Sequence, residues 1–221
     1  FKQKTAYEIP KRDWSSDVCS SDLAAKRAVQ AGFDFVELHA AHGYLVHQFL
    51  SPISNHRNDR YGGDFTGRTR FITEVITSIK TNLPAGFPLS VRISATDWVD
   101  GGWDIEQSVE LAKIMKKLGV DLIDVSSGGS VHDAKIPIGP GYQTEFAERI
   151  KREVGITVST VGYYESADFA NSAVVNNRAD IVMIGRAALR NPRFPLQAAA
   201  ELGVDVTWPK SLALGKPRPA K

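Results

Sequence analysis

Two histidines and a tyrosine stand close together in the run His39-Ala-Ala-His42-Gly-Tyr44. The run follows a short apolar stretch of strand-like composition, so it falls where a strand turns into a helix. Neutral imidazoles that converge on one atom can each donate an N–H to a carbonyl oxygen and stabilise negative charge developing there. Tyr44 adds a phenol suited to donating a proton. Two other interpretations stay open: a hydrogen-bonded pair of core histidines, or a metal site that includes Glu37.

A single arginine, Arg92, interrupts the apolar stretch 89–93. A guanidinium inside an apolar strand is costly unless it faces an anion or an electron-rich ring. One interpretation is a structural ion pair inside the fold. The other is a fixed cation beside a cofactor, where the charge would stabilise a reduced, anionic form.

Glycines follow the last two apolar stretches, as Gly162 and as Gly185-Arg186. Glycine at a strand end lets backbone N–H groups approach an anion closely, and the N-terminus of a following helix attracts phosphate. Barrels often place a phosphate site after their last two strands. The pattern therefore predicts a phosphate site, with ordinary strand-to-helix turns as the alternative.

Five short stretches rich in branched apolar residues are expected to form strands, and segments with helical spacing lie between them. The expected strands are residues 35–39, 89–93, 122–125, 157–161 and 181–184. The octapeptides AGFDFVEL, LGVDLIDV and NRADIVMI share one plan, in which a helix ends, an aspartate follows and a strand begins. This repetition predicts a parallel sheet wrapped by helices.

Periodicity alone does not separate a barrel from an open, doubly wound sheet. No G-x-G-x-x-G follows any expected strand, so the dinucleotide-binding fingerprint of the open fold is missing. Polar residues instead cluster after several strands, as barrel active sites require. They are His39 and His42, Arg92, Ser126–Ser127, Gly162 and Gly185–Arg186. We therefore expect an α/β fold, a (βα)8 TIM barrel of which only the last five or so βα units are present.

Composition limits the class of protein. Hydrophobic residues make up 43% and charged residues 24% of the 221 residues, as in soluble globular proteins. The net charge of +2 is too small to indicate nucleic acid or an acidic membrane surface as a partner, and no apolar run approaches the roughly 20 residues of a membrane span. The one cysteine, Cys19, excludes an internal disulfide and fits a cytoplasmic location.

The first 23 residues differ from the rest. They show no apolar period and no central apolar stretch of a signal peptide, so we expect them to be disordered. The runs KQKTAYEI and DWSSDVCSSDL resemble in-frame translations of a common sequencing adapter, which makes this leader a non-native segment. The expected division is a leader over 1–23, the barrel part over 24–206 and a C-terminal tail over 207–221.

The stretch from His39 to Phe71 resembles the signature of flavin oxidoreductases of the old yellow enzyme family. Its most specific part is SPISNHRNDRYGG, and VRIS, DLIDVSSGG, TVGYY and ADIVMIGRAALRNP are similar to the family in order and spacing. The likeness covers roughly residues 24–204. The His-Ala-Ala-His spelling resembles the bacterial xenobiotic-reductase or thermophilic-type class.

The resemblance implies an ene-reductase, or NADPH dehydrogenase, that carries FMN at the barrel mouth. NADPH or NADH would reduce the FMN, which would pass hydride to the C=C bond of an α,β-unsaturated carbonyl compound. His39 and His42 would hold the carbonyl oxygen of this enone, and Tyr44 would donate the proton.

For the cofactor, the resemblance implies that Arg92 contacts the flavin ring and that Gly162, Gly185 and Arg186 hold the phosphate. The parent protein is expected to be a homo-oligomer that acts on small molecules, with no nucleic-acid or membrane partner. Three βα units would be missing before Ala24, so we expect exposed strand edges, an apolar barrel interior facing water, poor solubility and weak FMN affinity.

Two other functions stay open. One is part of a dienoyl-CoA or trimethylamine-type flavin reductase, which shares this barrel. The other is a non-catalytic barrel remnant that binds a phosphate ligand.

Overall fold

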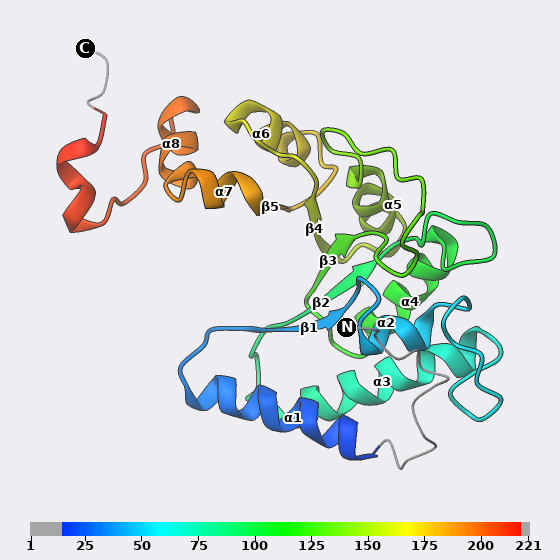
Figure 1. The fold of residues 1–221 in the computed structure, drawn as a ribbon. Helices are drawn as coiled ribbons and strands as arrows, with labels where there is room; N and C mark the ends of the chain where they lie inside the picture. The colour runs from blue at the N-terminus through cyan, green and yellow to red at the C-terminus, as the bar shows by residue number, and fades with distance from the viewer. Residues whose placement is uncertain (1–14, 218–221) are drawn as a thin grey trace.

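The computed structural model describes residues 15–217, with the backbone alone for residues 15–20. After α1 (Ser15–Gln30), strands and helices alternate along the chain (Figure 1). The strands are β1 (Val36–Ala40), β2 (Leu89–Ser94), β3 (Leu122–Ser126), β4 (Thr157–Val161) and β5 (Ile181–Met183). The other helices are α2 (Leu45–Leu50), α3 (Phe65–Asn82), α4 (Ile105–Lys117), α5 (Thr144–Val154), α6 (Ala167–Val175), α7 (Arg186–Arg190), α8 (Phe194–Glu201) and the 3-10 helix η1 (Lys210–Gly215). The predicted strands are confirmed, with each end displaced by at most one residue.

The described strands form one parallel sheet in the order β1-β2-β3-β4-β5. A doubly wound sheet reverses its strand order at a switch point, and this order shows no reversal. Every crossover therefore runs in the same sense, and α3, α4, α5 and α6 lie along the outer side of the arc of strands (Figure 1). The sheet is part of a (βα)8 barrel, as the sequence predicts.

The two faces of this sheet carry different side chains. Residues such as Val91 point outward into a hydrophobic core shared with α3 and α4. The middle of the inner face is polar: the Ser90 hydroxyl donates to the Glu37 carboxylate at 2.7 Å, and the Ser159 hydroxyl donates to Asp124 at 2.6 Å. The expectation of an apolar interior facing water therefore holds only in part, because Ile181 of β5 lies on the inner face and is exposed, whereas residues such as Val91 lie under the helices.

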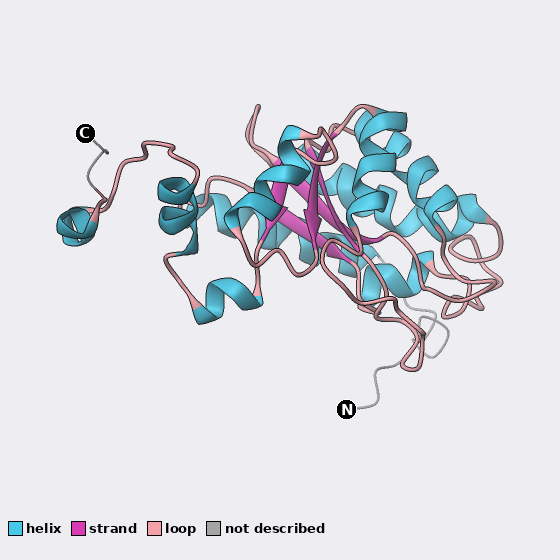
Figure 2. Ribbon diagram, turned by 90° about the horizontal axis from the view of Figure 1, so that it is seen from above, coloured by secondary structure: helices cyan, strands magenta, loops and turns pink. Residues whose placement is uncertain are grey.

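The unpaired edges of the sheet do expose apolar side chains. Within the described residues β1 pairs only with β2, and β5 pairs only with β4. Phe33 and Phe35 before β1, and Ile181 in β5, are exposed. A short arm of α7, α8 and η1 continues past β5 and extends away from the sheet (Figure 2). Among the described helices, none combines the length and apolar character that a membrane crossing requires.

The repeated aspartates join neighbouring strands. Asp121, just before β3, accepts a hydrogen bond from the backbone N–H of Leu89 at 2.9 Å, where β2 begins. Asp180, just before β5, accepts one from the N–H of Val158 at 3.0 Å in β4. These two aspartates each satisfy a donor of the preceding strand, which explains why LGVDLIDV and NRADIVMI share this residue.

The first helix begins inside the segment expected to be disordered. Residues 15–23 are helical, and the Asp22 carboxylate accepts a hydrogen bond from the Asn82 side chain of α3 at 2.9 Å. Once the helix over residues 24–30 exists, adding residues at its N-terminus gains one backbone hydrogen bond each without a new nucleus. The structure therefore differs from the expectation over 15–23. Residues 1–14 lie outside the described part, and the non-native origin of the leader stays a prediction.

Candidate functional site

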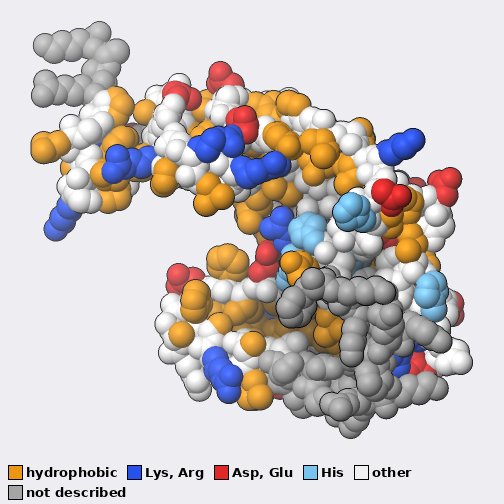
Figure 3. All heavy atoms as spheres, in the orientation of Figure 1, with side chains coloured by type: hydrophobic (Ala, Val, Ile, Leu, Met, Phe, Trp, Pro, Cys, Tyr) orange, Lys and Arg blue, Asp and Glu red, His pale blue; other side chains and the backbone are white. Residues whose placement is uncertain are grey.

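The C-terminal ends of the strands meet at one end of the sheet, which we call the mouth. The molecule is hollowed between the part that contains α1 and the C-terminal arm, and histidine and basic side chains gather at the inner end of this hollow (Figure 3). The site residues predicted from the sequence come from the ends of β1, β2, β4 and β5.

His39, His42 and Tyr44 lie together at the mouth. The ring centroid of His39 is 5.3 Å from that of His42 and 5.2 Å from that of Tyr44. Tyr44 immediately precedes α2, and its side chain is 54% exposed. Glu37, the residue considered as a metal ligand, instead accepts the hydrogen bond from Ser90. Among the described residues, no group of three or more His, Cys, Asp or Glu side chains is placed to hold a metal ion.

The loop that carries His42 is held in an uncommon conformation. His42 has a φ of 58°, in the left-handed region, and its backbone N–H donates to the Ser94 hydroxyl at 3.0 Å. A Cβ on Gly43 would meet the Gly129 carbonyl oxygen at 2.6 Å, and a Cβ on Gly129 would meet the Cα of His42 at 2.4 Å. The β1–α2 loop therefore packs backbone against backbone on the β3–α5 loop, and only glycine fits at the contact.

A buried pair anchors this loop from below. His47 of α2 accepts a hydrogen bond at Nδ1 from the Gly43 N–H at 2.9 Å, and its Nε2 lies 3.2 Å from the Asp97 carboxylate. Both side chains are fully buried. Asp97 also accepts hydrogen bonds from the Ser51 hydroxyl at 2.6 Å and the Trp103 N–H at 2.8 Å. Burial alone would raise the pKa of Asp97, but these contacts hold it below its ordinary value.

Both histidines of the mouth are neutral near pH 7. Burial, helped by the positive charge of Arg92, lowers the pKa of His42 to about 4. The same two causes lower the pKa of His39. A neutral imidazole donates one N–H and accepts at its other nitrogen, so each ring can offer one hydrogen to a ligand.

Arg92 lies in a row of inner-face residues across neighbouring strands, paired in register with His39 on one side and Asp124 on the other. Its Nη1 is 3.1 Å from the fully buried Asp124 carboxylate, so the structural ion pair exists. Its Nε is also buried and has no hydrogen-bond partner among the described residues. Arg92 therefore keeps an unused donor beside the mouth.

One cavity of about 250 Å³ brings together Arg92, Gly162, Gly185 and Arg186. Arg186 lies over the Tyr163 ring, with Cζ 4.4 Å from the centroid, which holds its charge at the mouth. The helix N-termini contribute less to a phosphate site than the sequence suggests. The helix after Gly185 has only five residues, and α6 begins five residues after Gly162, so neither glycine opens a long helix. Ser126 lines the same cavity and contacts His42, so the histidines and the cavity adjoin.

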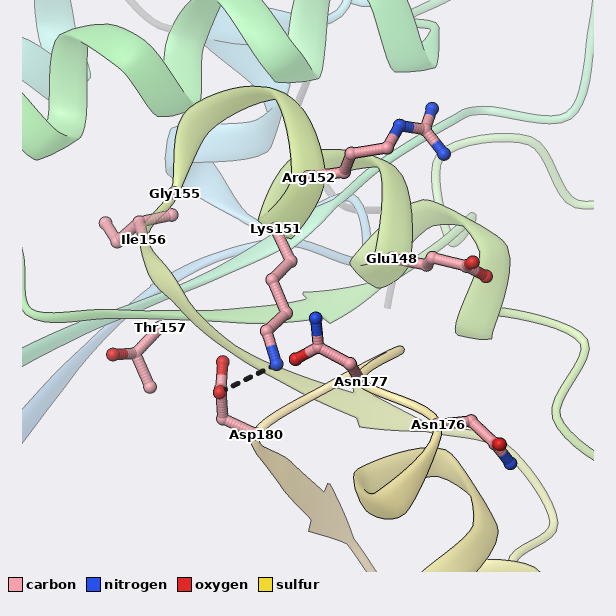
Figure 4. A pocket seen from close by; sticks show the side chains of 9 residues that line it. All are labelled: Glu148, Lys151, Arg152, Gly155, Ile156, Thr157, Asn176, Asn177 and Asp180. Atoms are coloured by element: carbon pink, nitrogen blue, oxygen red, sulfur yellow. Dashed lines mark ion pairs between the residues drawn. The ribbon is translucent and has the colours of Figure 1, made fainter.

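A larger cavity, of about 490 Å³, lies at the opposite end of the sheet (Figure 4). Its lining includes Gly155 and Thr157 at the start of β4 and Asp180 before β5. Barrel chemistry belongs to the C-terminal ends of strands, while the opposite end contributes to stability. The smaller cavity is therefore the candidate site.

Sequence reasoning placed Ser126 and Ser127 at the mouth but assigned no role to three residues that support it. These are His47, Asp97 and Gln143. No local sequence pattern marks His47 and Asp97, because their contact forms between residues of separate βα units. Gln143 carries no signal that could have found it, because it lies in a loop and reaches the site only through the fold.

Comparisons with known proteins agree with this geometry. The model of the NADH:flavin oxidoreductase / NADH oxidase family matches residues 6–204. An NADPH dehydrogenase of Bacillus velezensis is 45% identical over 208 residues, covering 94% of this chain and 61% of that protein. The chain thus spans about three fifths of the length of this curated relative.

Two solved structures share the fold. A 2-naphthoyl-CoA reductase in complex with 2-naphthoyl-CoA superposes with a TM-score of 0.78 at 27% identity, covering 86% of this chain and 29% of that one. Morphinone reductase in complex with tetrahydroNAD gives 0.71 at 26% identity, covering 91% and 52%. The family match extends over most of the chain and includes the whole mouth of the sheet. The chain therefore belongs to the NADH:flavin oxidoreductase / NADH oxidase family.

Proposed function

We propose that this chain is part of an FMN-dependent oxidoreductase that uses NADPH or NADH to reduce the C=C bond of α,β-unsaturated carbonyl compounds. The observation that carries the proposal is the meeting of His39, His42 and Tyr44 beside a cavity that also contains Arg92 and Arg186. Two neutral donors, one phenol and two fixed cations fit an enone next to an anionic, phosphate-bearing cofactor.

The residues of the cavity fit FMN. Arg92 Nε is a buried donor without a partner in the described part of the chain, and a ring oxygen or nitrogen of the cofactor could satisfy it. Gly162 has a φ of 144°, and a Cβ there would lie 3.2 Å from the Tyr142 ring. Glycine therefore suits this position, and its backbone stays accessible from the cavity. Arg186 would supply the charge for the phosphate. When bound and reduced, FMN would supply the hydride, and the protein would supply position and charge.

The histidines would bind the substrate oxygen. His39 and His42 are neutral, so each donates one N–H without bringing a net positive charge. Donors fixed at the place where negative charge develops stabilise the transition state more than the ground state. Tyr44, beside His39 and more than half exposed, would deliver its phenolic proton to the carbon α to the carbonyl.

A second function has one observation in its favour. The 2-naphthoyl-CoA reductase superposes with a higher TM-score than morphinone reductase, which supports the dienoyl-CoA type of flavin reductase. The sequence favours the first proposal, because the NADPH dehydrogenase of B. velezensis is 45% identical and the CoA-ester reductase 27% identical.

The test separates cofactor binding from substrate reduction. The 221-residue chain is titrated with FMN, and quenching of the flavin fluorescence reports binding. A full-length protein that carries this chain is then reduced by NADPH without oxygen and mixed with 2-cyclohexenone or with 2-naphthoyl-CoA. We expect rapid reoxidation by the enone and none by its saturated analogue, cyclohexanone. Reoxidation by the CoA ester alone would favour the second function, and no reoxidation by either would reject both.

A further inference from the structure

Three buried polar side chains lie behind His42. Ser126 ends β3, Ser127 follows it, and Gln143 precedes α5. They are 4%, 8% and 3% exposed, respectively, so their hydrogen bonds must be made within the protein. Because the hydrogens of such groups are limited in number, their distances decide which group donates to which.

The orientation of the Gln143 side chain is fixed by its donor. Its Nε2 lies 2.8 Å from the backbone oxygen of Val161, which can only accept. Its Oε1 therefore faces the two serines and acts as the acceptor. The Ser127 hydroxyl donates to Oε1 at 2.6 Å, a normal length for an O–H donor, and Oε1 keeps a second lone pair for one further donor.

The Ser126 hydroxyl has one hydrogen and two possible acceptors. His42 Nε2 lies 2.7 Å away, and Gln143 Oε1 lies 3.2 Å away. Bonds from O–H donors are typically about 2.5–3.0 Å long, and bonds from N–H donors about 2.7–3.2 Å, most often about 2.9–3.0 Å. The short contact lies in the middle of the O–H range and at the short end of the N–H range, and the long contact lies beyond the O–H range. The hydrogen of Ser126 points to His42.

We propose that Ser126 fixes His42 as the tautomer that carries its hydrogen on Nδ1. A neutral imidazole has one N–H, and the hydrogen bond at one nitrogen decides which nitrogen keeps it. With Nε2 accepting from Ser126, Nδ1 is the donor, and it has no hydrogen-bond partner among the described residues. Under the proposed function, on which this step rests, this N–H is the one that holds the substrate oxygen, and Ser126 is a positioning residue.

The helix that follows this loop, α2, contains a histidine with the opposite expected tautomer, which serves as an internal reference. His47 accepts at Nδ1 from the Gly43 N–H, and a backbone N–H cannot accept in return. Its hydrogen therefore resides on Nε2, toward Asp97. Two histidines five residues apart are thus expected to show opposite tautomers in one spectrum.

The experiment reads the tautomer directly. The 221-residue chain is labelled with nitrogen-15 histidine, and two-dimensional NMR at neutral pH distinguishes protonated from bare ring nitrogens. We expect His42 with hydrogen on Nδ1 and His47 with hydrogen on Nε2. Ser126→Ala should convert His42 to a mixture of both tautomers. Ser90→Ala is the matched control, because Ser90 is an equally buried strand serine whose recorded side-chain hydrogen bond goes to Glu37.

Ser127→Ala tests the competition for the hydrogen. Without Ser127, Gln143 Oε1 loses its nearer donor, so the Ser126 hydroxyl should turn toward it and leave His42 with hydrogen on Nε2. A wild-type His42 with hydrogen on Nε2, or a tautomer that ignores both serine substitutions, would overturn the proposal. The wild-type spectrum alone decides this if a variant fails to fold.

Kinetics then separate this inference from the proposed function. In the full-length protein with FMN, Ser126→Ala should lower kcat for the enone by about tenfold to a hundredfold, since one donor of the pair is weakened. A full-length protein that reduces no enone would reject the proposed function. The tautomer of His42 would still be decided by the NMR spectrum alone.

Discussion

The two ends of the sheet differ in how many of their buried polar groups have partners and in how strained their backbone is. At the mouth, three residues other than glycine adopt the left-handed backbone conformation: His42, Trp98 and Tyr163, with φ of 58°, 62° and 52°. Two buried donors there, Arg92 Nε and Trp98 Nε1, have no hydrogen-bond partner within residues 15–217. Strained backbone and unsatisfied donors persist where the surrounding structure imposes them, and they cluster at functional sites.

The opposite end satisfies its polar groups. Lys151 pairs with Asp180 at 2.9 Å (Figure 4), and Lys116 donates to the backbone oxygens of Val154 and Gly155 at 2.8 and 2.9 Å, which caps the end of α5. The left-handed residue near this end, Asn177, follows α6, where asparagine commonly ends a helix. The contrast indicates that the mouth is built for a ligand and the opposite end for stability.

The largest effect that could break this comparison is expected at Tyr44. In a full-length protein loaded with FMN, Tyr44→Phe should slow enone reduction by on the order of 10²–10⁴-fold, the range for loss of a general acid. Reduction of the flavin by NADPH should keep its rate, because the phenol hydrogen plays no part there. Stopped-flow absorbance separates the two half-reactions.

Tyr61→Phe is the control for that variant. Tyr61 is a buried tyrosine whose hydroxyl donates to Glu74, outside the mouth. An enone rate in Tyr44→Phe that equals the rate in this control would mean that Tyr44 is not the proton donor, and it would favour a barrel that only binds its ligand.

The next effect concerns the anchor beneath the mouth. His47→Ala removes the basic partner of the fully buried Asp97 and leaves the Gly43 N–H without its acceptor. Because Nδ1 of His47 accepts a hydrogen bond, the variant loses a packed ring and the acceptor of a buried N–H and not a charge, and leaving such a donor unsatisfied costs roughly 1–3 kcal/mol. We expect that loss in urea unfolding of the 221-residue chain. A loss below about 1 kcal/mol would show that the pair does not anchor the loop.

Much of the fold was readable from the sequence, for a physical reason. Short branched stretches bounded by turn residues gave the strands, and the aspartates before the strands marked the helix-to-strand joints. The polar residues at the strand ends could be assigned to the mouth because parallel strands bring their C-terminal ends together. The apolar interior was predicted only in part, since its middle is polar although strands of parallel sheets are usually buried on both faces. The alternation of Glu37 and His39 with apolar neighbours in β1 was the signal against that view.

The supporting residues could not be found in the same way. His47 meets Asp97 across 50 positions of sequence, and Ser126 meets His42 across 84. Such contacts depend on how loops from separate βα units pack, which no local pattern encodes. The proposed tautomer of His42 depends in turn on the difference between two distances from the Ser126 hydroxyl, 2.7 Å to His42 and 3.2 Å to Gln143.

A smaller effect follows from the pKa of His42. The unfolded chain binds a proton at this imidazole near pH 6.5, while the folded chain resists it down to about pH 4. Protonation therefore favours unfolding, so stability should fall as the pH decreases from about 6.5 and level off below about 4. The full shift corresponds to about 3 kcal/mol, which solvent screening of a partly exposed ring reduces to on the order of 1 kcal/mol.

Urea unfolding of the 221-residue chain across this pH range measures that effect. His42→Asn removes the titrating group and keeps an amide donor near the position of Nδ1. The wild type should lose stability on acidification more steeply than this variant. Equal slopes would show that His42 is not the group that resists protonation.

The smallest effect is expected at the opposite end of the sheet. Lys151→Ala, like His47→Ala, removes the basic partner of an aspartate, but the Lys151–Asp180 pair is partly open to solvent. Asp180 keeps its hydrogen bond from the Val158 N–H, and water can replace the lysine. Solvated pairs contribute about 0–1 kcal/mol, so urea unfolding should change within that range. A loss as large as that of His47→Ala would contradict the comparison of the two ends. It would show that the charged side chains at the opposite end are as important for stability as the buried contacts beneath the mouth.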